Sequence, residues 1–312
     1  RLWDGWDTSP TKLATRLQDG KLASELLRKI LETQENPTPL YQAIKNHLVE
    51  GADFLETSQI SNAANRFKTA FNNYSEINLY RKKSSVSEIM TQMIYGENFS
   101  VIQKRNRWWK IKIREDGYIG FIKKKNFIEP LKPTHKVSIL SAKIYSEPNL
   151  KKNCGTLTFG SKIKSRGRSS KFIKFQNKWI KSKDLKPIKF KNKNIFSYIK
   201  IFKNVKYKWG GKTFKGVDCS ALIQLLFQFN NKYCPRDAKD QVRYFKKNVN
   251  LKNIKKNDII YWKGHVAAVL SKKNLIHAYG PFKKTVVMKI DKTIKRIAKT
   301  AKLKILSIKR VK

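Results

Sequence analysis

Cysteine and histidine are scarce in this chain, and long hydrophobic runs are absent. Three cysteines among 312 residues cannot form a fully paired disulfide framework, so we expect free thiols and a reducing compartment. The histidines and cysteines lack the ligand count of a zinc site, so we expect no metal, and no other cofactor is indicated. No run of about 18 or more apolar residues occurs, so we expect no membrane-spanning helix.

Acidic residues are also few. The chain has 22 Asp and Glu against 69 Lys and Arg, a formal net charge of +47. Residues 1–80 hold 9 basic and 10 acidic residues, whereas residues 81–312 hold 60 and 12. This abrupt change near Arg81 predicts that the N-terminal segment is a separate unit.

The basic charge bears on possible partners. A lysine-rich chain with aromatic residues can bind nucleic acid through phosphate contacts. Here the lysines are scattered through the whole sequence, and arginine, the better reader of bases, is scarce. We therefore predict a solvated surface that attracts carboxylate-rich peptides, and no nucleic-acid partner. The oligomeric state does not follow from the sequence.

The first part of the chain has a helical pattern. Residues 1–72 carry apolar residues at three- and four-residue spacing in 12–31 and 40–55, with Pro37 and Pro39 between these runs. We expect a helical segment there, and no function follows from the pattern. The first seven residues lack the pattern of a signal peptide, although the sequence does not begin with methionine. A cytoplasmic protein is therefore expected, with a periplasmic or wall-associated protein as the alternative.

The most informative stretch surrounds Cys219. From residue 207 to residue 224 it reads YKWGGKTFKGVDCSALIQ, in which glycine-rich backbone gives way to apolar residues at helical spacing. A cysteine at a helix N-terminus lies beside unpaired N–H groups and the positive end of the helix dipole. Both favour the thiolate, which is the nucleophilic form. Cys219 is therefore the predicted nucleophile, whereas Cys154 and Cys234 are interpreted as small core residues.

A nucleophilic thiol needs a base, and two of the four histidines lie downstream in strand-like runs. Residues 258–270 are predicted to form strand, Lys-Gly turn and strand, with His265 opening the second strand, and residues 274–280 a third strand that contains His277. Neighbouring antiparallel strands lie about 4.8 Å apart, so the two imidazoles can touch. Cys219 would then be the nucleophile, His265 the base and His277 the orienting residue. The alternative is that each histidine is a satisfied core residue.

Between the helical segment and Cys219 lies an internal repeat, from about residue 77 to 131 and from about residue 136 to 188. Each copy contains an aromatic–glycine pair and a tryptophan-containing basic strand: Tyr95-Gly96 and Trp109–Lys112 in the first, Phe159-Gly160 and Trp179–Lys181 in the second. Short alternating strands of this length predict two small β-barrels, at residues 73–132 and 133–190.

The residues from about Ile201 to the C-terminus resemble the NlpC/P60 cysteine peptidases, a papain-like family that acts on bacterial cell-wall peptides. The family's Y-x-W-G-G…G-x-D-C-S motif is matched at eight positions: Tyr207, Trp209, Gly210, Gly211, Gly216, Asp218, Cys219 and Ser220. Its base histidine follows a glycine, as His265 does, and its third polar residue is commonly a second histidine, as at His277. Residues 234–241, with Arg236, resemble the segment that lines the family's substrate groove. Ala221 departs from the family's usual glycine.

The two predicted barrels resemble bacterial SH3 domains, most clearly in the segment 116–122. The implied fold class is α+β: a papain-like NlpC/P60 domain at residues 191–312, two small SH3-like β-barrels before it, and the helical N-terminal segment. The barrels are either rigid spacers or, as we favour, the first barrel closes one end of the peptidase groove.

This domain order resembles the γ-D-glutamyl-L-diamino acid endopeptidases of the dipeptidyl-peptidase VI type. The resemblance implies hydrolysis of murein peptides that carry a free N-terminal L-Ala. A site that requires a free amine needs an acid and hydrogen-bond acceptors. Asp218 and Ser220 suit that role by resemblance, with Tyr207 nearby, and Trp209 and Arg236 complete the expected substrate-binding residues.

Alternative interpretations stay open at this point. Asp218 could be a helix N-cap, and Trp209 could be core packing as well as groove wall. Glycines 210 and 211 could form a simple turn instead of admitting a bound peptide. The same Cys–His chemistry serves general peptidoglycan endopeptidases, amidases and acyltransferases, and a non-catalytic basic protein that binds the wall or a nucleic acid is the remaining class.

Overall fold

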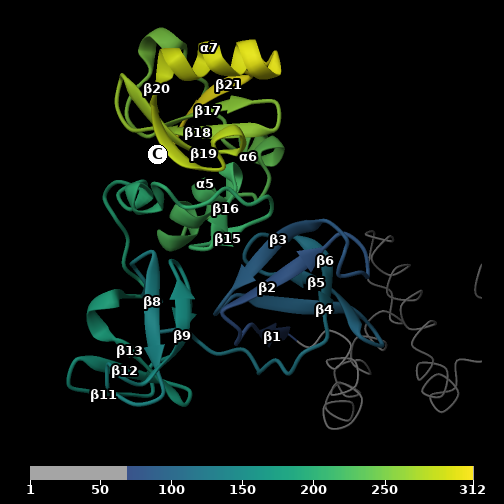
Figure 1. Cartoon of the computed structure of the whole chain (residues 1–312), viewed down its shortest axis with the longest axis vertical. Coiled ribbons are helices and arrows are strands. Elements are labelled where there is room, and N and C mark those ends of the chain that lie inside the picture. Colours follow the sequence, from purple (N-terminus) through teal and green to yellow (C-terminus); the bar gives the residue numbers. More distant parts are fainter. Residues whose placement is uncertain (1–68, 312) are drawn as a thin grey trace, which may run out of the picture. The chain divides into compact units, whose positions relative to one another are not determined.

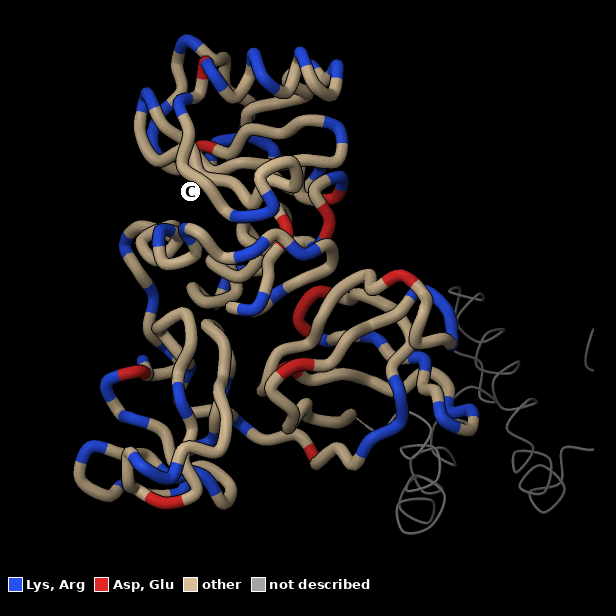
Figure 2. Tube along the Cα trace, in the orientation of Figure 1, with Lys and Arg blue, Asp and Glu red and all other residues tan. Residues whose placement is uncertain are grey.

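The computed structural model describes residues 69–311, and three strand-rich regions follow one another along them (Figure 1). The helical pattern predicted within residues 12–55 lies outside the described residues, so that prediction stays untested. Within the described part, no helix is long and apolar enough to cross a membrane. Figure 2 shows Lys and Arg along nearly every element of this part, as the scattered sequence pattern predicts.

The first region is a six-stranded antiparallel sheet in the order β1-β4-β5-β6-β2-β3. Its strands are β1 (Thr69–Phe71), β2 (Glu76–Tyr80), β3 (Ile89–Ile94), β4 (Asn98–Arg105), β5 (Trp108–Ile113) and β6 (Ile119–Lys123). Alternate residues point inward, and the buried set comprises Ile77, Leu79, Met93, Phe99, Val101, Ile111, Ile113 and Ile122. The region begins earlier than the predicted residue 73, because β1 pairs with β4. We call it the first β-domain.

The second region contains two sheets, in the orders β10-β7-β14 and β11-β12-β13-β8-β9. Its strands are β7 (His135–Val137), β8 (Ser141–Tyr145), β9 (Asn153–Thr158), β10 (Lys162–Ile163), β11 (Gly167–Ser169), β12 (Phe172–Phe175), β13 (Lys178–Lys181) and β14 (Leu185–Pro187). Its core is shared with the first β-domain, since Tyr95 packs edge-on against both Phe71 and Phe175. The two small β-domains therefore pack against each other directly.

The third region is a five-stranded antiparallel sheet, β20-β19-β18-β17-β21, with helices on both faces (Figure 1). Its elements are α5 (Cys219–Phe229), α6 (Ala238–Tyr244), β17 (Asp258–Trp262), β18 (His265–Val269), β19 (Asn274–Tyr279), β20 (Lys284–Lys289), α7 (Ile290–Ala301) and β21 (Ser307–Arg310), with a short pair β15 (Lys212–Thr213) and β16 (Gly216–Val217) before them. Short 3₁₀ helices lie at Ser182–Asp184, Ile199–Phe202, Leu251–Asn253 and Gly280–Phe282. The strands predicted within residues 258–270 and 274–280 are confirmed.

Successive residues of these strands bury against opposite helices. Val266 and Ala268 belong to the cluster that contains α5, whereas Ala267 and Val269 belong to the cluster that contains α7. Continuous burial on both faces explains why strands β17 and β18 are apolar throughout rather than alternating. The sheet with α5 forms the α+β domain that the sequence predicted.

Candidate active site

Cys219 is the first residue of α5, and the reason is local. Asp218 has extended backbone angles, and its side chain accepts a hydrogen bond from the N–H of Ala221, which makes it the N-cap. The strand β16 ends immediately before it. Cys219 is a free cysteine and is only 5% exposed. The predicted nucleophile therefore lies at a helix N-terminus, beneath the protein surface.

The sulfur of Cys219 lies beside the start of β18. Backbone N–H groups of Val266 and Ser220 point at it and act to lower the pKa of the thiol. Val266 directly follows His265 in the chain, so the nucleophile and the predicted base belong to the same small region.

His265 and His277 are in direct contact. Ala268 pairs with Ile276 across β18 and β19, a register that puts the two histidines at diagonal positions on the same face of the pair. Nε2 of His265 lies 2.8 Å from Nδ1 of His277. This hydrogen bond fixes the His265 ring and leaves its Nδ1 without a partner among the side-chain hydrogen bonds of the described residues. The His277 ring is fully buried and is stacked on Tyr279, with centroids 4.6 Å apart.

Burial favours the neutral forms of the thiol and of both imidazoles. Burial, followed by the charge of Asp218, raises the pKa of the Cys219 thiol to about 12. Burial lowers the pKa of His265 to about 4, and burial together with His265 lowers that of His277 to about 3. The expectation that the helix N-terminus favours the thiolate is therefore wrong here, because desolvation outweighs the helix dipole and the N–H groups.

Asp218 and Arg236 form a buried pair rather than facing the substrate as predicted. Arg236 is 3% exposed, and its Nη2 lies 2.5 Å from Asp218 Oδ2. Its Nη1 donates to Asp218 Oδ1 at 3.0 Å and to Ser220 Oγ at 2.9 Å. The Gly210 N–H also donates to the carboxylate, at 2.9 Å. Both oxygens of Asp218 are thus engaged, which corrects its expected role as acceptor for a substrate amine and leaves the N-cap alternative.

Tyr207, Trp209 and the glycine loop differ in role. Burial raises the pKa of Tyr207, with the neighbouring Cys219 next in effect, so its phenol lies near the nucleophile. Trp209 is 59% exposed, and its Nε1 donates to Glu88 Oε1 of the first β-domain at 2.9 Å. It is a surface residue, not core packing. Gly210 has φ +70, and a Cβ there would collide with the Ile89 carbonyl, so this glycine admits the first β-domain rather than a peptide.

The sequence analysis missed two acidic residues where the first β-domain contacts the third region, namely Glu88 and Asp237. The Tyr118 hydroxyl lies 3.3 Å from Asp237 Oδ2, and Arg81 Nε lies 2.6 Å from Glu88 Oε2. Asp237 follows Arg236 directly and makes no ion pair among the described residues. Burial raises its pKa. Asp237 lay inside the groove-lining segment noted in the sequence, but its Tyr118 partner comes from another domain and carries no local signal.

The described residues contain no metal site, and the two other cysteines do not form a second catalytic site. Within residues 69–311 no group of histidine, cysteine and acidic side chains is arranged to hold a metal ion. Cys234 is buried, as predicted, whereas Cys154 is exposed on β9 and is not the core residue we expected.

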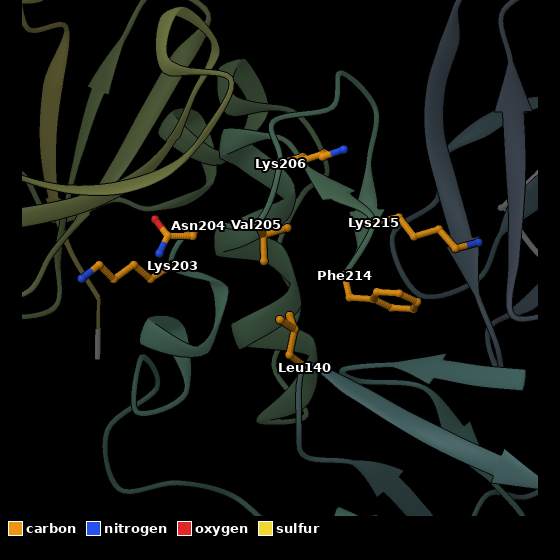
Figure 3. Close-up of a pocket in the computed structure, with 7 residues that line it drawn as sticks. All are labelled: Leu140, Lys203, Asn204, Val205, Lys206, Phe214 and Lys215. Atoms are coloured by element: carbon orange, nitrogen blue, oxygen red, sulfur yellow. The ribbon is translucent and has the colours of Figure 1, made fainter. Parts of the chain in front are cut away.

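Cys219 does not line the cavity of about 460 Å³ that Figure 3 shows. This cavity is lined by Leu140, Lys203, Asn204, Val205, Lys206, Phe214 and Lys215. The side chains of Lys203 and Lys215 point to opposite sides in Figure 3, and Lys215 pairs with Glu76 at 2.9 Å. The amines therefore do not converge on one ligand position, and none of the candidate site residues lines this cavity.

Comparisons with known proteins agree with this geometry. The sequence matches the NlpC/P60 family over residues 204–299 and the bacterial dipeptidyl-peptidase Sh3 domain over residues 79–127. A gamma-D-glutamyl-L-lysine dipeptidyl-peptidase of Bacillus subtilis (strain 168) is 26% identical over 233 residues, which are 66% of this chain and 77% of the relative. Dipeptidyl-peptidase 6 of Lysinibacillus sphaericus is 33% identical over 72 residues, 23% of this chain and 27% of the relative.

A solved structure supports the fold. The crystal structure of an NlpC/P60 family protein from Bacillus cereus ATCC 10987 covers 78% of this chain and 99% of that protein, with 18% identity and a TM-score of 0.67. The family match and the named relatives together define the class: the protein is a hydrolase that carries an NlpC/P60 domain. That domain follows a bacterial dipeptidyl-peptidase SH3 domain, as the sequence resemblance implied.

Proposed function

We propose that this protein hydrolyses the γ-D-glutamyl-L-diamino acid bond of peptidoglycan peptides that carry a free N-terminal L-Ala. Two relatives are named for dipeptidyl-peptidase activity, one of them at a γ-D-glutamyl-L-lysine bond. The observation that carries the free-amine requirement is Asp237, which is bonded to the Tyr118 hydroxyl of the first β-domain and makes no ion pair among the described residues.

In the proposed mechanism Cys219 attacks the γ-glutamyl carbonyl. The thiol and the imidazole are both neutral beforehand, so the proton moves from sulfur to Nδ1 of His265 as the new C–S bond forms. His277 stabilises the resulting imidazolium through its hydrogen bond to Nε2 of His265. His265 then protonates the leaving amine of the diamino acid, and water hydrolyses the thioester to regenerate the thiol.

The oxyanion formed during attack needs hydrogen-bond donors. The backbone N–H of Cys219 at the start of α5 is one donor in this proposal. The Tyr207 hydroxyl is the second, since burial keeps this phenol protonated beside Cys219. Both donors belong to elements whose positions are fixed by backbone contacts, including Tyr207 N–H to the Lys283 carbonyl at 2.8 Å.

The free amine would be recognised at the first β-domain. Asp237 is half-buried and is bonded to the Tyr118 hydroxyl but to no cation among the described ion pairs. Burial raises the pKa of Asp237, which means that it disfavours the charged carboxylate. A substrate ammonium beside Asp237 would stabilise this charged form. Glu88 lies at the same boundary, but its charge is already paired with Arg81, so its oxygens would serve only as further hydrogen-bond acceptors. An acylated amine is a neutral amide, so it would offer Asp237 neither the positive charge nor the three N–H donors of an ammonium group.

The test is a side-by-side rate measurement on L-Ala-γ-D-Glu-diamino acid and its N-acetylated form. The proposal predicts that acetylation slows cleavage at least about a hundredfold, which corresponds to about 2.7 kcal/mol. Equal rates would mean an open groove, and the protein would then act as a general endopeptidase on intact peptidoglycan.

A further inference from the structure

One buried side chain of the first β-domain reaches the candidate active site. Thr91, in the middle of β3, is fully buried, and its Oγ1 accepts a hydrogen bond from Nε of Arg236 at 2.7 Å. The other two nitrogens of Arg236 donate to Asp218 and Ser220, the residues on either side of Cys219. The guanidinium is thus held by one hydroxyl from one domain and by two residues of the other.

The surroundings show that β3 is fitted against this part of the peptidase region. Next to Thr91, Gln92 Oε1 accepts from the Lys212 N–H at 2.9 Å. The Lys212 ammonium pairs with Glu97 at 2.7 Å, with both side chains buried. The Ile89 carbonyl lies where a side chain on Gly210 would stand. Thr91 therefore lies within a close-packed contact, where a lost acceptor would leave Arg236 Nε buried and unsatisfied.

We propose that Thr91 is a positioning residue of the peptidase centre, whose hydroxyl fixes the Arg236 guanidinium between Asp218 and Ser220. The guanidinium is planar, so a hydrogen bond at Nε fixes the orientation of its plane. Set in this way, it neutralises Asp218 next to the nucleophile. The inference rests on the proposed function only where hydrolysis of the tripeptide is measured. The alkylation of Cys219 can be followed without any substrate.

The consequence falls on Cys219. Asp218 raises the pKa of the thiol, and Arg236 lowers it. When the guanidinium loses this acceptor, its plane is no longer fixed against Asp218, the carboxylate acts on the sulfur with less compensation, and the thiolate becomes harder to form. Loss of the Thr91 hydroxyl should therefore shift the reactivity of Cys219 toward higher pH, an effect that a mere loss of packing does not produce.

The experiment compares Thr91→Val, Thr91→Ala and Thr91→Ser in the full chain. The rate of Cys219 alkylation by iodoacetamide is followed against pH by peptide mass analysis, and kcat and KM are measured on L-Ala-γ-D-Glu-diamino acid. For the Val and Ala variants we expect the alkylation profile to move up by about one pH unit, a roughly tenfold smaller thiolate fraction. We expect kcat to fall by about the same factor with little change in KM, and Ser to restore both.

A matched control is Thr293→Val in α7, which removes another fully buried threonine hydroxyl, one that donates to the Lys289 carbonyl. Its alkylation profile should coincide with that of the wild type. Should Thr91→Val fail to fold, the Ser and Ala variants still differ by the oxygen atom. Identical profiles for Ser and Ala at position 91, or a Val profile equal to that of the wild type, would overturn the proposal. A wild type that cleaves no wall peptide would instead refute the proposed function, and the alkylation comparison would still decide the role of Thr91.

Discussion

The buried ion pair between Lys212 and Glu97 gives a sharp test of how the first β-domain is joined to the peptidase region. The two side chains are 0% and 2% exposed, and their charged atoms lie 2.7 Å apart. Replacing Lys212 by Met leaves the Glu97 carboxylate buried and unpaired, still accepting the Ile94 N–H at 2.8 Å. Removing one partner of a buried pair typically costs about 3–5 kcal/mol.

The assay is the free energy of unfolding of the full chain in urea, measured at several pH values. Burial already raises the pKa of Glu97, and Lys212 is the main group that opposes this shift. Without Lys212 the carboxyl should take up a proton at a higher pH than in the wild type. The deficit of Lys212→Met should therefore be largest at neutral pH and should shrink as the pH falls through the raised pKa of the variant.

Two further variants complete this test. The double change Lys212→Met with Glu97→Gln removes both charges and keeps an acceptor for Ile94, so it should recover most of the lost stability. Lys215→Met breaks an exposed pair with Glu76 and should cost at most about 1 kcal/mol. Equal losses for Lys212→Met and Lys215→Met, or a deficit that does not change with pH, would refute the reasoning.

The remaining predictions concern the reaction. Cys219→Ala should abolish hydrolysis of the tripeptide in a product assay, and retained activity would remove it as the nucleophile. His265→Ala should lower kcat by several orders of magnitude, whereas His277→Ala should lower it less. His277→Gln should partly restore kcat, because glutamine can supply the hydrogen bond to Nε2 of His265. Equal small losses of kcat for the two alanine variants would mean that both histidines are core residues. Asp237→Asn should narrow the rate ratio between free and acetylated substrate by about tenfold or more, as for loss of a charged hydrogen bond, while Asp291→Asn on α7 should leave the ratio unchanged.

The parts of the site that could be predicted are those with a local signal. The Gly-rich run before Cys219 and the apolar pattern after it indicate a turn followed by a helix, and α5 begins at that residue. The Lys-Gly turn before His265 and the short run around His277 indicate adjacent strands, and the structure places the two imidazoles in contact. Periodicity and turn residues are sufficient here, because each feature lies within one short, continuous stretch of the chain.

The parts that could not be predicted depend on contacts between distant segments. Asp218 was expected to face a substrate amine, but its partner Arg236 comes from the segment after α5 and reaches back to the start of that helix. Thr91 and Tyr118 belong to another domain, and no pattern in their own strands marks them as neighbours of the site. The thiolate expectation failed for a related reason, since the burial of Cys219 is a tertiary property.

The central claim is that this chain cuts the bond between γ-D-Glu and the diamino acid by means of Cys219. The most direct measurement is digestion of a defined L-Ala-γ-D-Glu-diamino acid tripeptide by the purified full chain, with mass analysis of the products. The account predicts two products, the dipeptide L-Ala-γ-D-Glu and the free diamino acid. Release of L-Ala instead, or no cleavage of this or any longer wall peptide, would contradict it.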